Sequence, residues 1–448
     1  MYFYTVDEVL EPKNLTELIA KFKGAPVRRF ERLEKYYRVQ NEILRRTAGD
    51  GKPNNRLAHG FAKYITRMAT GYFMGNGVKY VVPDEAYKDA LFEVLKGGDT
   101  DCNNFELAKE ASKKGIAFEL LFVDEQRQVR AQNFYAKDII PIYSQKVGRF
   151  MECAVRIWTQ KGFGGGTTEY AEVYTATDIH CFSKGKGSKL YKLDEVRPHH
   201  FDDIPIVVYW NNEEQTGDYE DVISLIDAYD KAQSDTANDS EYFADAYFYI
   251  SGASGGITDG FEKEGDEPDP KRAYATMRRE KVLHFDEKGQ AGFITKDIND
   301  KATENYKTRL YEDIFFIAQT PPMSDENFAG NLSGVAIRYK FVGLDEMTTE
   351  KERKFVSAQR KKIRLITGFL NTKNNKSYDP ATVEVKIEYN LIKNETEDIK
   401  NIKALTGIIS HQTQLEQLHF VKDAAAELER TRPAANNRPF YYGEEYDN

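Results

Sequence analysis

The segment PPMSDENFAGNLSGVAIRYKF, residues 321–341, lies between two stretches of helical patterning in the second half of the chain. Its two prolines end the preceding helix, because proline has no N–H to donate within a helix. Small and polar side chains continue to Ser333–Gly334, and an apolar helical pattern starts again at Val335. A polar loop between two helices is typical of a functional element. Its residues leave open whether it is a catalytic loop, a binding loop or a moving part of an assembly.

Length and composition limit the classes of protein to which the chain can belong. The chain has 448 residues, which allows a large core and about two to four structural units. Hydrophobic residues make up 40% and charged residues 30%, which favours an elongated protein or a subunit with much solvated or channel-lining surface. The aromatic content of 13% argues against disorder. A formal net charge of −9 argues against a simple nucleic-acid clamp.

Cysteine usage and hydropathy favour a soluble intracellular protein. Cys102, Cys153 and Cys181 are too few and too scattered for a disulfide framework or a zinc site, so we expect reduced thiols. The first residues show neither a basic region nor an apolar run typical of a signal peptide. No apolar run approaches the ~20 residues that span a bilayer.

The first half of the chain reads as helices followed by strands. Residues 13–47 predict two amphipathic helices separated near Gly24–Pro26, and a third helix is expected from Asn54, with Asn55 able to cap it. Residues 84–117 also look helical. Short alternating runs such as FELLFVD, ECAVRIWTQ and YAEVYTA then predict an antiparallel β unit that extends to Tyr191. The run IPIVVYW, 204–210, predicts one further buried strand.

Two more helices are expected before the opening segment. Residues 211–245 contain eleven Asp or Glu and one Lys, and an apolar stripe within them predicts a helix. A Gly- and acid-rich insertion, 251–270, comes next, followed by the strand candidates KVLHF (281–285) and GFITK (292–296). Residues 305–319 predict the second helix.

Beyond the opening segment, helical patterning continues to about residue 369. Thr349 and Glu352 have capping-box spacing, which predicts a kink between Gly343 and Thr349. The run VEVKIEY, 383–389, predicts a strand, and residues 396–430 predict helix before a frayed tail.

Patterns that carry chemistry are missing from the sequence. The glycine-rich segments lack the GxxxxGK[ST] spacing that surrounds a nucleotide phosphate chain. His199 and His200 are adjacent, and adjacent side chains do not face one metal from a helix or strand. No HExxH or Cys–His nucleophile pattern occurs. We therefore expect no enzyme, no catalytic residue, no cofactor and no metal site, although an active site without a familiar motif stays a rival interpretation.

Five blocks, in order, resemble those of tailed-bacteriophage portal proteins of the type found in siphophages of Gram-positive hosts. The likeness covers roughly residues 30 to 430. The blocks are NNRLAHGFAKYITRMATGYFMG, ELAKEASKKGIAFELLFVDE with IIPIY, IPIVVYWNNEEQTGDYEDVISLIDAYDKAQSDTANDSEYFADAYFYISG, TPPMSDENFAGNLSGVAIRYKFVGLDE and TGIISHQTQLEQLHFVKDAAAELER.

The resemblance implies an α+β portal fold and a head-to-tail connector. Identical subunits, usually twelve, would form a ring at one capsid vertex. A separate terminase would package double-stranded DNA through the ring, and the DNA would later leave through it into the tail. The implied parts are a wing (1–215), two stem helices (216–245 and 303–319), an inserted clip (246–302), a tunnel loop (320–333), a long kinked helix and strand (334–392), a helical crown (393–435) and a flexible tail (436–448).

The resemblance also implies partners and a place of action. The partners are the terminase large subunit, a head-completion adaptor, capsid and scaffold proteins, and DNA bound without sequence preference; no membrane is involved. The protein would be assembled in the host bacterial cytoplasm and end at the capsid vertex of the virion. A capsid-associated scaffold or connector that does not conduct DNA is the main alternative.

Two groups of residues are candidates for contact with DNA in the channel. The tunnel-loop candidates are Ser324, Asp325, Glu326, Asn327, Phe328, Ala329, Gly330 and Asn331. The basic candidates near the channel are Lys351, Arg353, Lys354, Arg360, Lys361 and Lys362. For the basic group, an ion-paired or solvated helix face is the alternative. A stem rich in Asp and Glu would give a surface that DNA slides past, since DNA carries one negative charge per ~1.7 Å.

Overall fold

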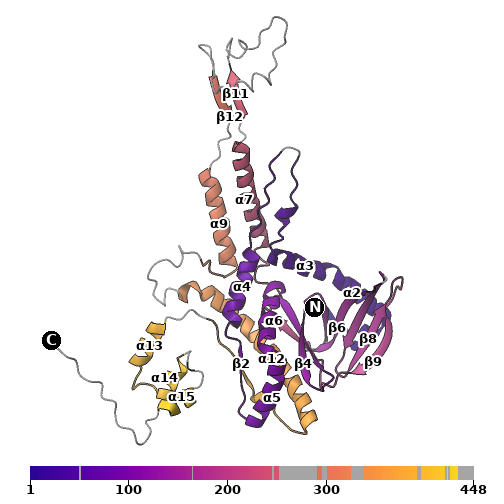
Figure 1. Cartoon of the computed structure of the whole chain (residues 1–448). Helices are drawn as coiled ribbons and strands as arrows, with labels where there is room; N and C mark the ends of the chain where they lie inside the picture. The colour runs from indigo at the N-terminus through magenta and orange to yellow at the C-terminus, as the bar shows by residue number, and fades with distance from the viewer. Residues whose placement is uncertain are drawn as a thin grey trace, which may run out of the picture.

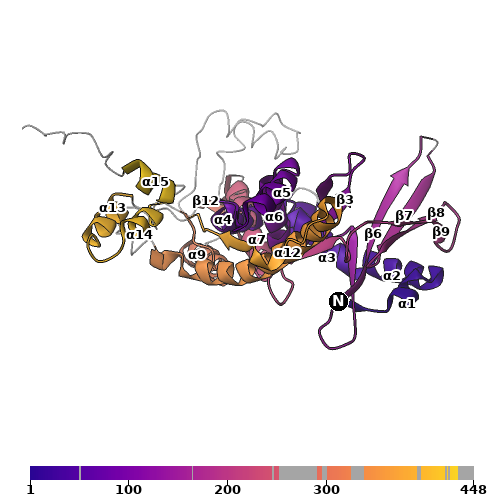
Figure 2. The ribbon, with the colours of Figure 1, turned by 90° about the horizontal axis from the view of Figure 1, so that it is seen from below.

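The computed structural model mixes helices and strands in one chain. A two-helix arm rises from a broad body that carries a large sheet at one end (Figure 1). Seen from below, the strands of that sheet and the last three helices lie at opposite ends of the molecule (Figure 2). The structure describes residues 1–49, 52–163, 165–244, 247–251, 290–294, 300–323, 338–390, 395–418, 421 and 424–431.

A six-stranded sheet forms one end of the body, with strand order β1-β5-β6-β7-β8-β9. Its strands are β1 (Tyr2–Phe3), β5 (Ile139–Tyr143), β6 (Met151–Lys161), β7 (Thr167–Tyr174), β8 (Asp178–Lys184) and β9 (Lys192–Pro198). All neighbours are antiparallel except β1 and β5, which confirms the antiparallel pairing predicted for the runs ECAVRIWTQ and YAEVYTA. The run FELLFVD, predicted in the same unit, lies in a separate sheet, and β9 extends the large sheet beyond Tyr191. Helices α1 (Val6–Leu10) and α2 (Pro12–Lys23) share a core with it, because the buried face of α2, including Leu15 and Phe22, packs with strand residues such as Val155.

A smaller sheet, β10-β3-β4, lies at the centre of the body. Its strands are β3 (Ile116–Val123), β4 (Val129–Phe134) and β10 (Ile206–Trp210), the last within the predicted run 204–210. The first six residues of β3 are buried, since helices pack beside it. Its surroundings include α5 (Glu85–Gly97), α6 (Thr100–Lys114), α12 (Val342–Asn374) and the two-stranded pair of β2 (Val78–Val81) and β13 (Glu384–Ile387).

Helix α12 differs from the expected kinked helix. It runs without interruption from Val342 to Asn374, and the irregular residue is Phe341, just before it. Thr349 is no N-cap, because its hydroxyl donates to the carbonyl of Asp345 one turn earlier. Glu352 accepts a hydrogen bond from the Tyr389 hydroxyl instead of closing a capping box. The predicted capping box is therefore wrong.

The arm consists of α7 (Ile223–Ala244) and α9 (Asp300–Ile317), which pack against each other. Strands β11 (Tyr247–Ser251) and β12 (Gln290–Ile294) pair in antiparallel register beyond the far end of α7 (Figure 1). Strand β12 overlaps the candidate GFITK. The candidate KVLHF and nearly all of the Gly- and acid-rich insertion lie outside the described residues.

The third helix starts later than its sequence suggests. The two N-terminal helices α2 and α3 (Ala25–Tyr37) meet at Gly24, as predicted, but α4 begins only at Phe61 and ends at Met74. Residues 39–60 are here called the strap; its described residues, 39–49 and 52–60, include the short helix η1 (Glu42–Arg45) and are otherwise without helix or strand. Asn55 caps nothing: its N–H and side chain bond Asn238 on the arm.

The described residues between 395 and 431 form three short helices where one helical stretch was predicted. They are α13 (Glu395–Ala404), α14 (His411–Glu416) and α15 (Ala424–Thr431). Gly407 lies between the first two with φ +86°, a left-handed conformation that ends a helix. None of the helices in the described ranges is both long and apolar enough to cross a membrane.

Candidate functional site

The predicted tunnel-loop residues, Ser324 to Asn331, lie outside the described residues, as do the positions up to 337. The chain on both sides of this gap is described, and both sides contact helix α4. The candidate site is therefore built from the two joints where the chain enters and leaves residues 324–337.

The first joint depends on the hydroxyl of Tyr64. It accepts a hydrogen bond from the N–H of Met323 at 2.7 Å and donates one to the carbonyl of Pro321 at 3.0 Å. Its ring packs edge-on against Phe315 at 5.4 Å, which ties the joint to the end of α9. Burial raises the pKa of Tyr64, so the hydroxyl stays protonated and able to donate at neutral pH.

The second joint depends on Tyr72, two turns further along α4. Its hydroxyl donates to the carboxylate of Asp345, and its ring stacks on Phe341 with centroids 5.8 Å apart. Burial, followed by the bond to Asp345, raises the pKa of Tyr72. Phe341 and Leu344 are buried around it in a small apolar cluster.

Helix α4 is a common anchor for the chain on both sides of residues 324–337, although α4 itself lies far from that segment in the sequence. Tyr64 and Tyr72 are eight residues apart, which corresponds to about 12 Å along a helix. Helix α4 is buried at its core-facing residues: Ala62, Ile65 and Ala69 are each 1% exposed or less. The chain before and after residues 324–337 is therefore tied to one buried helix.

The arm is joined to the strap by a row of polar contacts on one side of α7. Asp230, completely buried, accepts from the backbone N–H of His59 at 2.9 Å, lies 2.7 Å from His59 Nδ1 and accepts from Asn41 Nδ2. Ser234 accepts from the N–H of Leu57 at 2.9 Å. Because the strap leads directly into α4, these contacts connect the arm with the helix that carries both joints.

The acidic residues of the arm are mostly paired within the chain. Of the eleven acids in residues 211–245, those with a described partner are Glu213 (Lys354), Asp218 (Lys351), Glu220 (Arg29), Asp227 (Arg32 and Tyr36), Asp230 (His59 and Asn41), Asp235 (Arg46) and Glu241 (Asn55). These carboxylates bind neighbouring segments of the chain, and the expectation that DNA slides past an acid-rich stem stays a prediction.

The predicted basic group divides into buried and exposed members. Lys362 is 1% exposed and its Nζ lies 2.6 Å from Glu119, which is fully buried; Lys351 is buried against Asp218. Neither ammonium is free to reach a phosphate in this conformation, so burial removes both from the candidates.

The other four basic candidates lie closer to the surface. Lys354 pairs with Glu213. Lys361 donates to a backbone carbonyl on β10, and burial lowers its pKa to about 8. Arg353 and Arg360 are exposed, and their contact with DNA stays a prediction.

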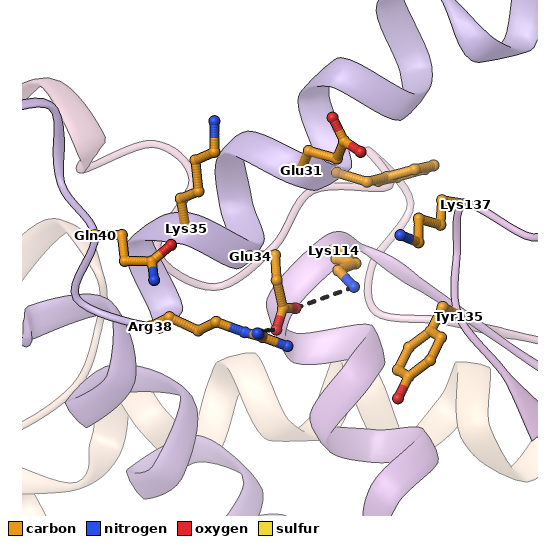
Figure 3. A pocket seen from close by; sticks show the side chains of 9 residues that line it. Glu31, Glu34, Lys35, Arg38, Gln40, Lys114, Tyr135 and Lys137 are labelled. Atoms are coloured by element: carbon orange, nitrogen blue, oxygen red, sulfur yellow. Dashed lines mark hydrogen bonds and ion pairs between the residues drawn. The ribbon is translucent and has the colours of Figure 1, made fainter.

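A hollow of about 410 Å³ lies between α3, the end of α6 and the residues that follow β4. Figure 3 shows Glu34 at its floor, bonded to Arg38 and Lys114. Burial alone would raise the pKa of Glu34, but its pairs with Lys113, Lys114 and Arg38 outweigh that effect and hold the pKa at about 2. The hollow is an ion-paired joint between helices, because its deepest charges already have partners.

Within the described residues, no group of three or more His, Cys, Asp or Glu could hold a metal ion. Sequence reasoning missed Tyr64 and Tyr72, although both lie in one of the five quoted blocks. A tyrosine on a buried helix face gives no signal of the distant backbone it will bond.

Comparison with known proteins matches most of the chain to one protein family. The family model described as "Phage portal protein, SPP1 Gp6-like" matches residues 23–437. A portal protein of Bacillus phage SPP1 is 26% identical, covering 96% of this chain and 88% of the relative. A portal protein of Clostridium phage phiCD119 is 24% identical, covering 87% of this chain and 88% of the relative.

Solved structures give weaker matches. A chain in the neck of an empty gene transfer agent particle has a TM-score of 0.48 and 10% identity, covering 80% of this chain and 90% of that one. A chain in the virion of a native gene transfer agent has a TM-score of 0.44, also at 10% identity, over 80% and 89%.

Proposed function

Since this chain belongs to the SPP1 Gp6-like family of phage portal proteins, we propose that its copies form a ring around a DNA channel at one capsid vertex. The ring, of twelve subunits in the virion, admits DNA during packaging and releases it into the tail during ejection. The family match over nearly the whole chain is the observation that carries this proposal. Tyr64 and Tyr72 support it, because they tie the chain before and after residues 324–337 to one helix, which suits a segment that meets a moving polymer.

The parts of the chain have separate roles in this ring. The arm helices α7 and α9 are the stem, and residues 246–302, which include β11 and β12, are the clip. Residues 1–215 form the wing, and residues 393–435 form the crown. Residues 320–333 are the tunnel loop; Tyr64 on α4 bonds Pro321 and Met323 at its beginning, and Tyr72 on the same helix bonds Asp345 beyond its end.

The tunnel loop acts as a compliant collar and not as a motor. No Lys or Arg occurs between Ser324 and Gly334, so the loop cannot grip phosphates by charge. Contacts from Asn327, Phe328, Asn331 and backbone N–H groups position DNA weakly and without sequence preference. The collar follows the DNA and hinders its slipping back.

The force for packaging comes from a separate terminase ATPase that docks on the clip, and a head-completion adaptor replaces it afterwards. The chain itself has no phosphate-binding loop. Deletion of Gly252 to Pro268 should leave rings intact and weaken terminase binding, measured by co-sedimentation of rings with terminase. Undiminished binding would contradict the clip assignment.

Replacing Glu326 to Asn331 with a six-residue Gly–Ser segment tests the collar. Ring assembly should be normal while packaging is slower or leakier, measured as nuclease-protected DNA per capsid. The matched control replaces the six exposed residues Gln145–Phe150 after β5 in the same way and should package normally. Loss of rings in the loop variant alone would make the segment a structural joint.

A further inference from the structure

Two glycine-rich turns lie together at one end of the large sheet. The first joins β6 to β7 and the second joins β8 to β9, and the antiparallel order β6-β7-β8-β9 places both at the same end. Glu169, just after the first turn, pairs in register with Lys184, just before the second. Figure 2 shows these four strands side by side, at the end of the molecule away from α13, α14 and α15. Neither turn belongs to the proposed stem, clip or tunnel loop.

Both turns are basic, although the whole chain is acidic. Residues 159–168 and 183–193 together contain five Lys and no Asp or Glu, whereas the chain has a formal net charge of −9. The described residues of these two stretches are here called the lysine end. Its lysines are Lys161, Lys184, Lys186, Lys189 and Lys192. A local excess of positive charge on an acidic protein indicates an anionic partner.

Most of the charges at the lysine end are available to a partner. Lys184 lies 3.7 Å from Glu169, and Lys23 of α2 binds the same carboxylate at 2.7 Å, so two cations share one acid. The other four lysines are exposed, and none of them forms an ion pair within the described part of the chain. The hollow at Glu34 differs, because its deepest cations already have acidic partners.

The backbone of each turn is also accessible. Gly165 and Gly187 have φ of +75° and +90°, in the left-handed region that glycine adopts readily. A Cβ built on either glycine meets nothing within 4 Å beyond its chain neighbours. An anion can therefore approach the backbone of both turns as well as their lysines.

The composition of the lysine end suits phosphates better than a protein surface. Protein interfaces are poor in Lys and have an apolar core, whereas the large exposed apolar side chains here, Phe163, Leu190 and Leu193, are fewer than the lysines. Lysine binds phosphate as a flexible point charge without fixed geometry. Four strands at a spacing of about 4.8 Å make this end about 14 Å wide, comparable with the ~12 Å major groove of duplex DNA. Its lysines can thus face phosphates on both sides of one groove.

We propose that the lysine end binds duplex DNA through its phosphates, without sequence preference and outside the proposed channel. The site needs neither the tunnel loop nor a closed ring, because all of its residues come from one chain. It is therefore a second place of DNA contact on the wing, independent of the collar.

Binding of the full-length protein to covalently closed circular duplex DNA tests this site. Closed circles cannot thread the channel of rings that have already formed, so they report contacts on the outside. Filter retention of the DNA over a range of salt concentrations measures the affinity. K186Q/K189Q should bind at least tenfold more weakly than wild type at about 50 mM salt, and its slope of log association constant against log salt should be shallower by about 2. K161Q should make the slope shallower by about 1, since the first turn contributes as well.

Two matched variants control for charge and for folding. K146Q/R149Q removes two exposed cations from the turn after β5, at the opposite end of the same sheet, and should bind like wild type. K186R/K189R keeps both charges and should also bind like wild type. Thermal melts check that these exposed substitutions leave the fold intact.

The outcomes separate the inference from the proposed function. Equal affinity of K186Q/K189Q and wild type, or an equal loss in K146Q/R149Q, overturns the inference and leaves the proposed ring standing. Polyglutamate that competes as well as DNA at equal charge also overturns it, because the surface then takes acidic protein. Protein that never forms rings, but binds closed circles through Lys186 and Lys189, overturns the proposed function and supports the inference.

Discussion

Changing Tyr64 to Phe removes one oxygen atom from the joint at residues 321–323, the beginning of the proposed tunnel loop, and leaves the aromatic ring in place. That oxygen accepts the Met323 N–H and donates to the Pro321 carbonyl. Packing against Phe315 should persist, since it involves only the ring. The substitution therefore loosens the loop end without opening the core of the arm.

The expected size of the effect on hydrogen exchange follows from the two lost hydrogen bonds. Each contributes about 1 kcal/mol net, so the free energy of opening the joint should fall by about 1–2 kcal/mol. Since 1.4 kcal/mol corresponds to a factor of ten, the Met323 amide should exchange with solvent about 5- to 30-fold faster. The free energy of global unfolding should change less, because the joint lies at the edge of the packed cluster.

Hydrogen–deuterium exchange with short peptides covering residues 315–323 measures this directly. Thr320 is an internal control, because its N–H bonds the Phe315 carbonyl and should exchange at an unchanged rate. Tyr135→Phe, at a ring that is 59% exposed, is the matched control variant. Unchanged exchange at Met323 in Tyr64→Phe would refute the role of the hydroxyl. Faster exchange with unchanged packaging would refute the view that the joint positions the loop.

Three further predictions concern the buried charges. Glu34→Gln should lower the free energy of unfolding at pH 7 by up to about 3 kcal/mol, because the pKa of Glu34 is about 2 in the folded chain against 4.5 for an unperturbed glutamate carboxyl. This stabilising contribution is present above pH 4.5 and is lost as the pH falls towards 2. The free energies of unfolding of wild type and variant should therefore converge at low pH. A difference that stays constant over this pH range would contradict the prediction. Lys362→Met should cost about 3–5 kcal/mol by leaving Glu119 buried and unpaired, and adding Glu119→Gln should restore part of that loss in urea titrations. Asp230→Asn should loosen the strap at His59 and speed proteolysis of the strap at least several-fold, and an unchanged cleavage rate would contradict the anchoring role.

Local sequence patterns predicted most of the helices and strands, because the patterning of a helix or a strand depends on residues that are neighbours in the chain. The alternation in the run ECAVRIWTQ and the stripe around Ile226 each reflect one buried face, and both became the expected strand and helix. The start of α4 was missed since Asn55 bonds Asn238, 183 residues later in the chain. No local pattern reveals such a partner.

The candidate site was harder to predict for the same reason. Lys362 looked like a channel cation in the sequence, but it pairs with Glu119, 243 residues earlier in the chain. Tyr64 bonds backbone more than 250 residues later. A family resemblance points to the loop, whereas the side chains that fix its ends depend on tertiary packing.

Cryo-electron microscopy of the purified full-length protein tests the central claim most directly. We expect closed rings with a central channel wide enough for duplex DNA, the arms side by side around it, and residues 324–337 lining its narrowest part. Compact monomers, or closed assemblies in which residues 324–337 face away from a channel, would contradict the account.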